Sequence, residues 1–218
     1  MTSTFERIAS CSQPRSLTAR TLLRPAYAQG KEDCRCRYQH LLFQSFIMVS
    51  NTANILLKRQ LDLLRKNPVE GFSAGLKDES NLYEWEIMII GPNDTLYEGA
   101  FLRAELVFPP EYPLLPPKMK FLTEMWHPNV YKDGGVCISI LHAPGQDEWG
   151  YEDASERWLP VHTVESILIS VISLLSSDTP NTDSPANIDA AKQVREDIVA
   201  YRKRVRRLVR QSADEGFL

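Results

Sequence analysis

The segment from Trp126 to Leu141, WHPNVYKDGGVCISIL, holds the side chains best suited to covalent chemistry. Cys137 follows a Gly-Gly pair, which allows tight backbone geometry and close approach by another chain. A cysteine thiolate is a strong nucleophile, so Cys137 is a candidate for covalent catalysis. The alternative is a buried small hydrophobe between Val136 and Ile138, which is the commoner role of a lone cysteine.

Two further polar side chains precede Cys137, His127 by ten residues and Asn129 by eight. His127 suits a Cys-His pair, or equally a histidine fixed by hydrogen bonds to the backbone of a His-Pro loop. Asn129 can donate its amide to an oxyanion, or can organise a turn. The residue types alone leave these alternatives open.

Hydrophobic periodicity predicts the elements that position this segment. From Asn51, the leucines at 57, 61 and 64 follow helical spacing, and Asn67-Pro68 ends the helix. The period then becomes two in the runs 83–89 and 101–108, and a short third run surrounds Met119 and Phe121. Strands this close together, with no helices between them, predict an antiparallel meander.

Helical periodicity returns after Pro160, with Thr163 as a suitable N-cap. This helix is apolar over most of its surface, which predicts a place in the core. Two shorter helices are expected after it, one around residues 186–195 and one in which Ile198, Tyr201, Val205 and Leu208 share a face. The order of helix, strands, irregular stretch and three helices predicts an α+β domain.

Composition narrows the class of protein. The 218 residues are 43% hydrophobic and 24% charged, ordinary globular values, and no apolar run is long enough for a membrane span. Residues 1–47 carry seven basic and three acidic residues, so this segment has a net charge of +4 and the remainder −7. A remainder this acidic argues against general binding of nucleic acid.

Residues 1–47 lack a sustained period and are expected to be a disordered extension before a domain over 48–218. Translated sequence upstream of a true start at Met48, or an organelle transit peptide, are the alternatives. Cys34 and Cys36 have no second Cys or His pair at zinc-site spacing, so no metal site is expected.

Four motifs in order resemble those of a ubiquitin-conjugating enzyme, from about Ile55 to the C-terminus. They are the proline-rich run 112–117 (YPLLPP), His127-Pro128-Asn129, a Cys eight residues beyond the Asn, and Trp158-Leu159-Pro160 before the apolar helix. The resemblance implies a UBC-like α+β fold with an N-terminal helix, a four-stranded antiparallel meander and three C-terminal helices.

The resemblance also implies the chemistry. Cys137 would accept the C-terminal glycine of ubiquitin from the ubiquitin-activating enzyme as a thioester, which a substrate lysine then attacks, with no metal or organic cofactor. Asn129 would steady that attack, by stabilising the oxyanion or by holding the loop, with His127 and Pro128 as structural support. Ser184, beside Asp183, matches the position that orients the lysine.

Residues 142–157 form a longer connection than in minimal family members and carry five acids, Asp147, Glu148, Glu152, Asp153 and Glu156. Such an acidic loop resembles the branch with the cell-cycle and endoplasmic-reticulum-degradation types. Without a long acidic tail, the chain resembles the tail-less subgroup associated with degradative polyubiquitin chains. The loop would guide an acceptor ubiquitin, the alternative being a solvated insertion.

The resemblance further implies a patch for a RING-type ubiquitin ligase, with Leu114 as its apolar anchor. The rest of the patch would be Lys58, Arg59, Leu159 and Pro160, and Ser73 would lie on an opposite, ubiquitin-binding face. Protein substrates complete the partners, in the cytoplasm or nucleus or at the endoplasmic reticulum surface. The rival interpretations are conjugation of another modifier, an inactive binding variant, and a mitochondrial protein.

Overall fold

The structure is a computed structural model that describes residues 52–147, 150 and 152–216. The extension predicted over 1–47, with Cys34 and Cys36, and the acidic residue Glu148 lie outside the described residues. The described chain begins in an amphipathic helix that runs to residue 66, directly before Asn67-Pro68, as the sequence predicts. Leu57 and Leu61 are buried on its inner face.

An antiparallel sheet follows, with strands β1 (Phe72–Leu76), β2 (Glu84–Ile90), β3 (Phe101–Val107) and β4 (Lys118–Phe121) in the order β1-β2-β3-β4. Buried side chains alternate along β2 and β3, where Trp85 pairs with Leu106 and Ile89 with Leu102. The predicted meander is confirmed. The pattern did not locate β1, because FSAGL contains no clear alternation.

Three helices complete the fold: α2 (Val164–Leu175), α3 (Ile188–Glu196) and α4 (Ile198–Gly216). The Thr163 side chain caps α2 by accepting a hydrogen bond from the Ser166 N–H, as the sequence predicts. The prediction of two short closing helices is wrong for α4, which has 19 residues against 12 in α2. Its last turns are held because Ser212 is buried and its hydroxyl accepts a hydrogen bond from the Phe101 N–H of β3.

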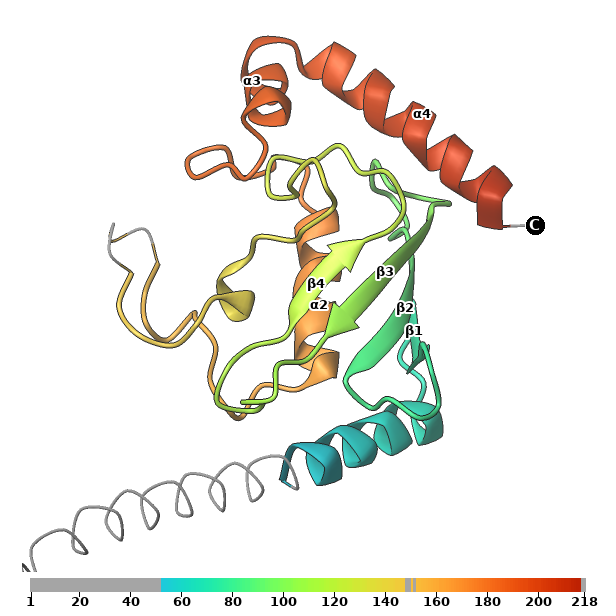
Figure 1. The fold of residues 1–218 in the computed structure, drawn as a ribbon. Helices are drawn as coiled ribbons and strands as arrows, with labels where there is room; N and C mark the ends of the chain where they lie inside the picture. The colour runs from blue at the N-terminus through green and yellow to red at the C-terminus, as the bar shows by residue number, and fades with distance from the viewer. Residues whose placement is uncertain (1–51, 148–149, 151, 217–218) are drawn as a thin grey trace, which may run out of the picture. The chain divides into compact units, whose positions relative to one another are not determined.

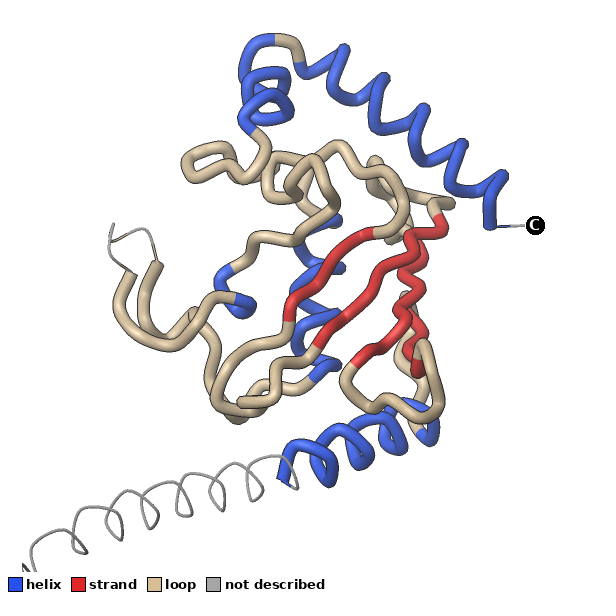
Figure 2. The backbone as a smooth tube through the Cα atoms, in the orientation of Figure 1, coloured by secondary structure: helices blue, strands red, loops and turns tan. Residues whose placement is uncertain are grey.

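The core lies between the sheet and α2, which passes behind β4 and β3 in Figure 1. Ile87 and Leu106 from the sheet and Ile167 and Val171 from α2 are fully or almost fully buried in it. Between β4 and α2 runs a long irregular connection, interrupted by the 3-10 turn η1 (Ser139–Leu141), as Figure 2 shows. The candidate site lies on this connection. Among the described helices, none combines the length and apolar character that crossing a membrane requires.

Candidate functional site

The backbone of β4 fixes the segment that leads to Cys137. The Phe121 N–H donates to the Gly134 carbonyl at 2.9 Å, and the Val136 N–H donates to the Met119 carbonyl at 3.0 Å. Gly134 has a φ of +95°, and a Cβ there would come within 2.2 Å of the Phe121 carbonyl oxygen. Glycine is therefore required at this position. The close neighbour is β4 of the same chain rather than the other chain anticipated from the sequence.

Asn129 and Cys137 are held together by their backbones, because the Cys137 N–H donates to the Asn129 carbonyl at 2.9 Å. The Asn129 N–H donates to Nδ1 of His127 at 3.0 Å, and His127 is completely buried. Burial lowers the pKa of His127 to about 4, so the ring is neutral at physiological pH. Of the two interpretations of His127, this geometry favours the one that braces the loop.

Pro128 links the same loop to the C-terminal helices. It is buried, and its carbonyl accepts a hydrogen bond from the Asn187 N–H at 2.8 Å, directly before α3. The Asn129 side chain is also largely buried, and its Oδ1 has no hydrogen-bond partner among the described residues. Asn129 also lines the cavity beside Cys137, so this carbonyl oxygen is available to accept a hydrogen bond from a reacting group.

A cavity of about 670 Å³ opens beside Cys137 and brings together the three residues predicted to be catalytic, Cys137, Asn129 and Ser184. Four carboxylates line the same cavity, from Asp147, Glu152, Glu156 and Asp183. Ser184 is exposed at its rim, and Asp153 is exposed but does not line it. The cavity is therefore suited to a cationic group such as a lysine ammonium. Within the described part of the chain, no three His, Cys, Asp or Glu side chains are grouped as metal ligands.

His142 is a site residue that the sequence analysis did not single out. Its Nε2 lies 3.4 Å from Sγ of Cys137, and its Nδ1 lies 2.9 Å from both carboxylate oxygens of Glu152. The Ser139 hydroxyl donates to the same carboxylate at 3.0 Å. A histidine five residues after a cysteine, at the start of an acidic loop, was the available signal. The turn η1 between them brings the two side chains together.

The environment of the thiol disfavours its ionised form. Burial is the main reason that the pKa of Cys137 lies above its ordinary value, and the negative charge of Glu152 raises it further. The Tyr131 hydroxyl, 3.9 Å from Sγ, acts in the opposite direction. A thiol of this kind needs a proton acceptor. If Nδ1 of His142 donates to Glu152, Nε2 presents its lone pair toward the sulfur.

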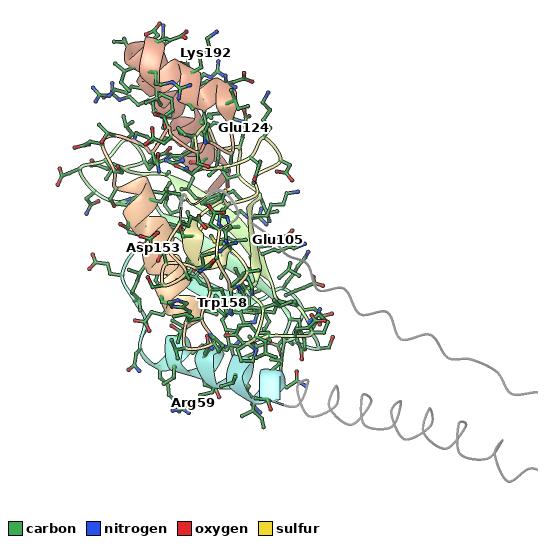
Figure 3. All side chains as sticks on the ribbon, turned by 90° about the vertical axis from the view of Figure 1, so that its left-hand side faces the viewer. Arg59, Glu105, Glu124, Asp153, Trp158 and Lys192 are labelled. Carbon is green, nitrogen blue, oxygen red and sulfur yellow. The ribbon has the colours of Figure 1, made fainter. Side chains whose placement is uncertain are left out.

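The residues predicted to contact a ligase lie on three segments that hydrogen bonds tie together. Gln60 on the first helix accepts a hydrogen bond from the Val164 N–H and donates one to the Tyr112 hydroxyl, both at 2.8 Å. The Trp158 indole donates to the Pro113 carbonyl at 2.8 Å. In Figure 3, the labelled residues Arg59 and Trp158 both lie in the lower half of the described part of the molecule.

The predicted patch residues themselves are exposed: Lys58, Arg59, Leu114, Leu159 and Pro160. Leu114 exposes 56% of its surface, which an apolar anchor for a partner requires. Ser73 is exposed on β1. The roles of all these residues stay predictions.

Comparison with known proteins assigns the family. A family model described as ubiquitin-conjugating enzyme matches residues 56–209. Ubiquitin-conjugating enzyme E2 15 of Schizosaccharomyces pombe is 64% identical over 167 residues, which cover 77% of this chain and 99% of that protein. Human ubiquitin-conjugating enzyme E2 G2 is 49% identical over 164 residues, covering 75% and 98% respectively.

Among solved structures, that of human ubiquitin-conjugating enzyme E2 G1 matches with a TM-score of 0.51 and 63% sequence identity, covering 56% of this chain and 93% of that chain. The predicted fold class is confirmed by this match and by the α+β architecture. Membership implies ubiquitin, an activating enzyme and a ligase as partners. The chain belongs to the ubiquitin-conjugating enzyme family and is a ubiquitin-transferring thioester enzyme.

Proposed function

We propose that Cys137 carries the ubiquitin thioester, and that a RING-type ligase directs its transfer to lysines of substrates or of ubiquitin itself to build degradative chains. The cavity that joins Cys137, Asn129 and the carboxylates of the acidic loop carries the proposal. Cys137 is also the sole cysteine among the described residues. We place the reaction in the cytoplasm or nucleus, or at the endoplasmic reticulum surface through a partner.

In the charging step, the sulfur of Cys137 attacks the thioester carbonyl that the activating enzyme presents. The thiol loses its proton, for which Nε2 of His142 at 3.4 Å is the nearest acceptor that the structure records. The new carbon–sulfur bond forms as the thiolate of the activating enzyme leaves. Because burial raises the pKa of Cys137, this proton acceptor contributes most near neutral pH.

In the transfer step, a lysine amine attacks the thioester carbonyl and the Cys137 thiolate leaves. The carboxylates that line the cavity attract the ammonium of the incoming lysine, which gives one proton to Nε2 of His142 beside Cys137. The second proton of the attacking nitrogen passes to the Cys137 thiolate as it leaves. Asn129 lies at the same cavity, where its amide can stabilise the tetrahedral oxyanion. Ser184 and Asp183 also line the cavity and would orient the amine.

Ligase recruitment is tested by replacing Leu114 with Ala. Leu122 supplies a matched control, since it is a leucine of similar exposure, 50% against 56%, that is not part of the predicted patch. Leu114→Ala is expected to lower ligase-stimulated discharge by about tenfold, as loss of an interface anchor does, and to leave discharge to free lysine unchanged. Leu122→Ala should change neither rate.

The assay uses the charged enzyme, free ubiquitin and the RING domain of a ligase that stimulates the wild type. Equal behaviour of the two leucine variants would remove Leu114 from the ligase surface. Chain type is read from a panel of ubiquitins that each keep a single lysine. Chains that form without preference among these lysines would contradict the degradative assignment.

A further inference from the structure

We propose that Arg157 is a positioning residue for ubiquitin transfer, because its guanidinium holds Glu152 against His142 and so fixes the imidazole beside Cys137. The inference rests on the proposed function, since it assigns a role in that reaction to a residue at the far end of the acidic loop. Neither Arg157 nor His142 was singled out in the sequence as a site residue.

The acidic loop is closed at its base directly beside Arg157. The Trp158 N–H donates to the His142 carbonyl at 3.0 Å, which brings the two ends of the loop together. Trp158 is completely buried, and its indole is anchored to the Pro113 carbonyl. The backbone of Arg157 is therefore held in place by its neighbour Trp158, and the Arg157 side chain extends into the loop.

The guanidinium lies between two carboxylates that belong to the two limbs of the loop. Arg157 Nη1 is 3.7 Å from Oδ1 of Asp147, and Arg157 Nε is 3.7 Å from Oε2 of Glu152. Without the cation, these carboxylates would face each other across the loop as like charges. A planar guanidinium suits this place because it can serve two carboxylates at once.

These pairs are protected from solvent, unlike the surface pairs of the same chain. The side chains of Arg157, Asp147 and Glu152 expose 16%, 17% and 18% of their surface. In the surface pair Lys192–Glu196 the corresponding values are 65% and 66%. Water and salt screen the Arg157 pairs less, so their contribution to the position of Glu152 is larger than that of an ordinary surface ion pair.

The carboxylate of Glu152 in turn fixes the orientation of the His142 imidazole beside the reacting sulfur. It is bound on one side by Nδ1 of His142 and by the Ser139 hydroxyl, and it faces Arg157 on the other. Nε2 of the same imidazole lies 3.4 Å from Sγ of Cys137. Loss of the guanidinium leaves a largely buried carboxylate without its counter-charge. Such a carboxylate turns toward water and releases the histidine.

The test is single-turnover discharge of the preformed thioester to free lysine, without a ligase. Arg157→Gln is expected to slow discharge about fivefold, the scale of losing a partly buried ion pair at 3.7 Å, and Arg157→Lys about twofold. Arg206→Gln is the matched control, because Arg206 is an exposed arginine on α4 that loses the same charge. It should discharge at the wild-type rate.

The decisive comparison is a double-mutant cycle with His142→Gln. If Arg157 acts through His142, the double variant discharges no more slowly than His142→Gln alone. A merely structural role would instead multiply the two losses. Multiplied losses, or wild-type discharge by Arg157→Gln, would overturn the proposal.

The thermal midpoint shows whether each variant is folded, since charging itself depends on His142 in the proposed reaction. If Arg157→Gln does not fold, Arg157→Lys takes its place in the cycle, and wild-type discharge by that variant would overturn the proposal. If the wild type itself forms no ubiquitin thioester, the proposed function fails and this inference fails with it. If the wild type charges while the cycle is additive, this inference alone fails.

Discussion

Replacing Glu152 with Gln separates a specific hydrogen bond from the general negative charge of the acidic loop. Glu152 exposes 18% of its side chain, and both of its oxygens lie 2.9 Å from Nδ1 of His142. Asp153 is its neighbour in the sequence but is exposed, and it forms no ion pair with the residues that the structure describes. Asp153→Asn removes the same charge from the same loop and is the matched control.

The two substitutions differ in expected size. A hydrogen bond to a charged group contributes about 1.5–3 kcal/mol and a neutral one about 0.5–1.5 kcal/mol, so the change to Gln weakens the hold on His142 by roughly 1.4 kcal/mol. In addition, the amide NH2 of Gln replaces one of the two oxygens that lie 2.9 Å from Nδ1 of His142. A loss of about 1.4 kcal/mol corresponds to about tenfold in rate. Removal of an exposed, screened charge at Asp153 should cost less than about twofold.

The assay follows decay of the charged enzyme on non-reducing gels after addition of free lysine, with the thermal midpoint of each variant as a control for folding. We expect Glu152→Gln to discharge about tenfold more slowly than wild type and Asp153→Asn to stay within about twofold. Equal losses in the two variants would refute the reasoning, because they would mean that the loop acts only through its total charge.

Three further outcomes follow from the site. Tyr131→Phe removes a contact that lowers the pKa of Cys137, so the pKa should rise further, and alkylation by iodoacetamide should slow about twofold at neutral pH and recover as pH rises. Asn129→Ala should charge normally but discharge to lysine about 10²-fold more slowly in a single-turnover assay, whereas equal losses in both steps would indicate a folding defect. Shortening the loop over residues 145–156 should reduce chain assembly more than charging, as gels of both reactions would show, and unchanged assembly would make the loop a simple surface insertion.

Most of the fold follows from local patterns in the sequence. The first helix, β2, β3 and the start of α2 were predictable because each combines one hydrophobic period with a clear boundary signal, such as Pro68 or Thr163. The strand β1 was not, because FSAGL has no alternation and is held mainly by its pairing with β2. The length of α4 was missed because its last turns depend on the contact of Ser212 with β3.

The candidate site was predictable only in part. The motif around Asn129 and Cys137 was recognisable by its resemblance to a family. The contacts among Cys137, His142 and Glu152 were not, because they depend on the turn η1 and on closure of the loop by Trp158, neither of which has a periodic signature. The sequence marked Glu152 as one acid among five, and only the structure distinguishes it from Asp153.

The most direct measurement is charging of the enzyme with ubiquitin, activating enzyme and ATP, followed on gels with and without reductant. The wild type is expected to gain one ubiquitin in a reductant-sensitive adduct, Cys137→Ser a reductant-resistant oxyester, and Cys137→Ala no adduct. A control in which Cys11, Cys34 and Cys36 are replaced together by Ser should charge like the wild type. A reductant-sensitive adduct on Cys137→Ala, lost in that triple variant, would contradict the assignment of Cys137 as the nucleophile.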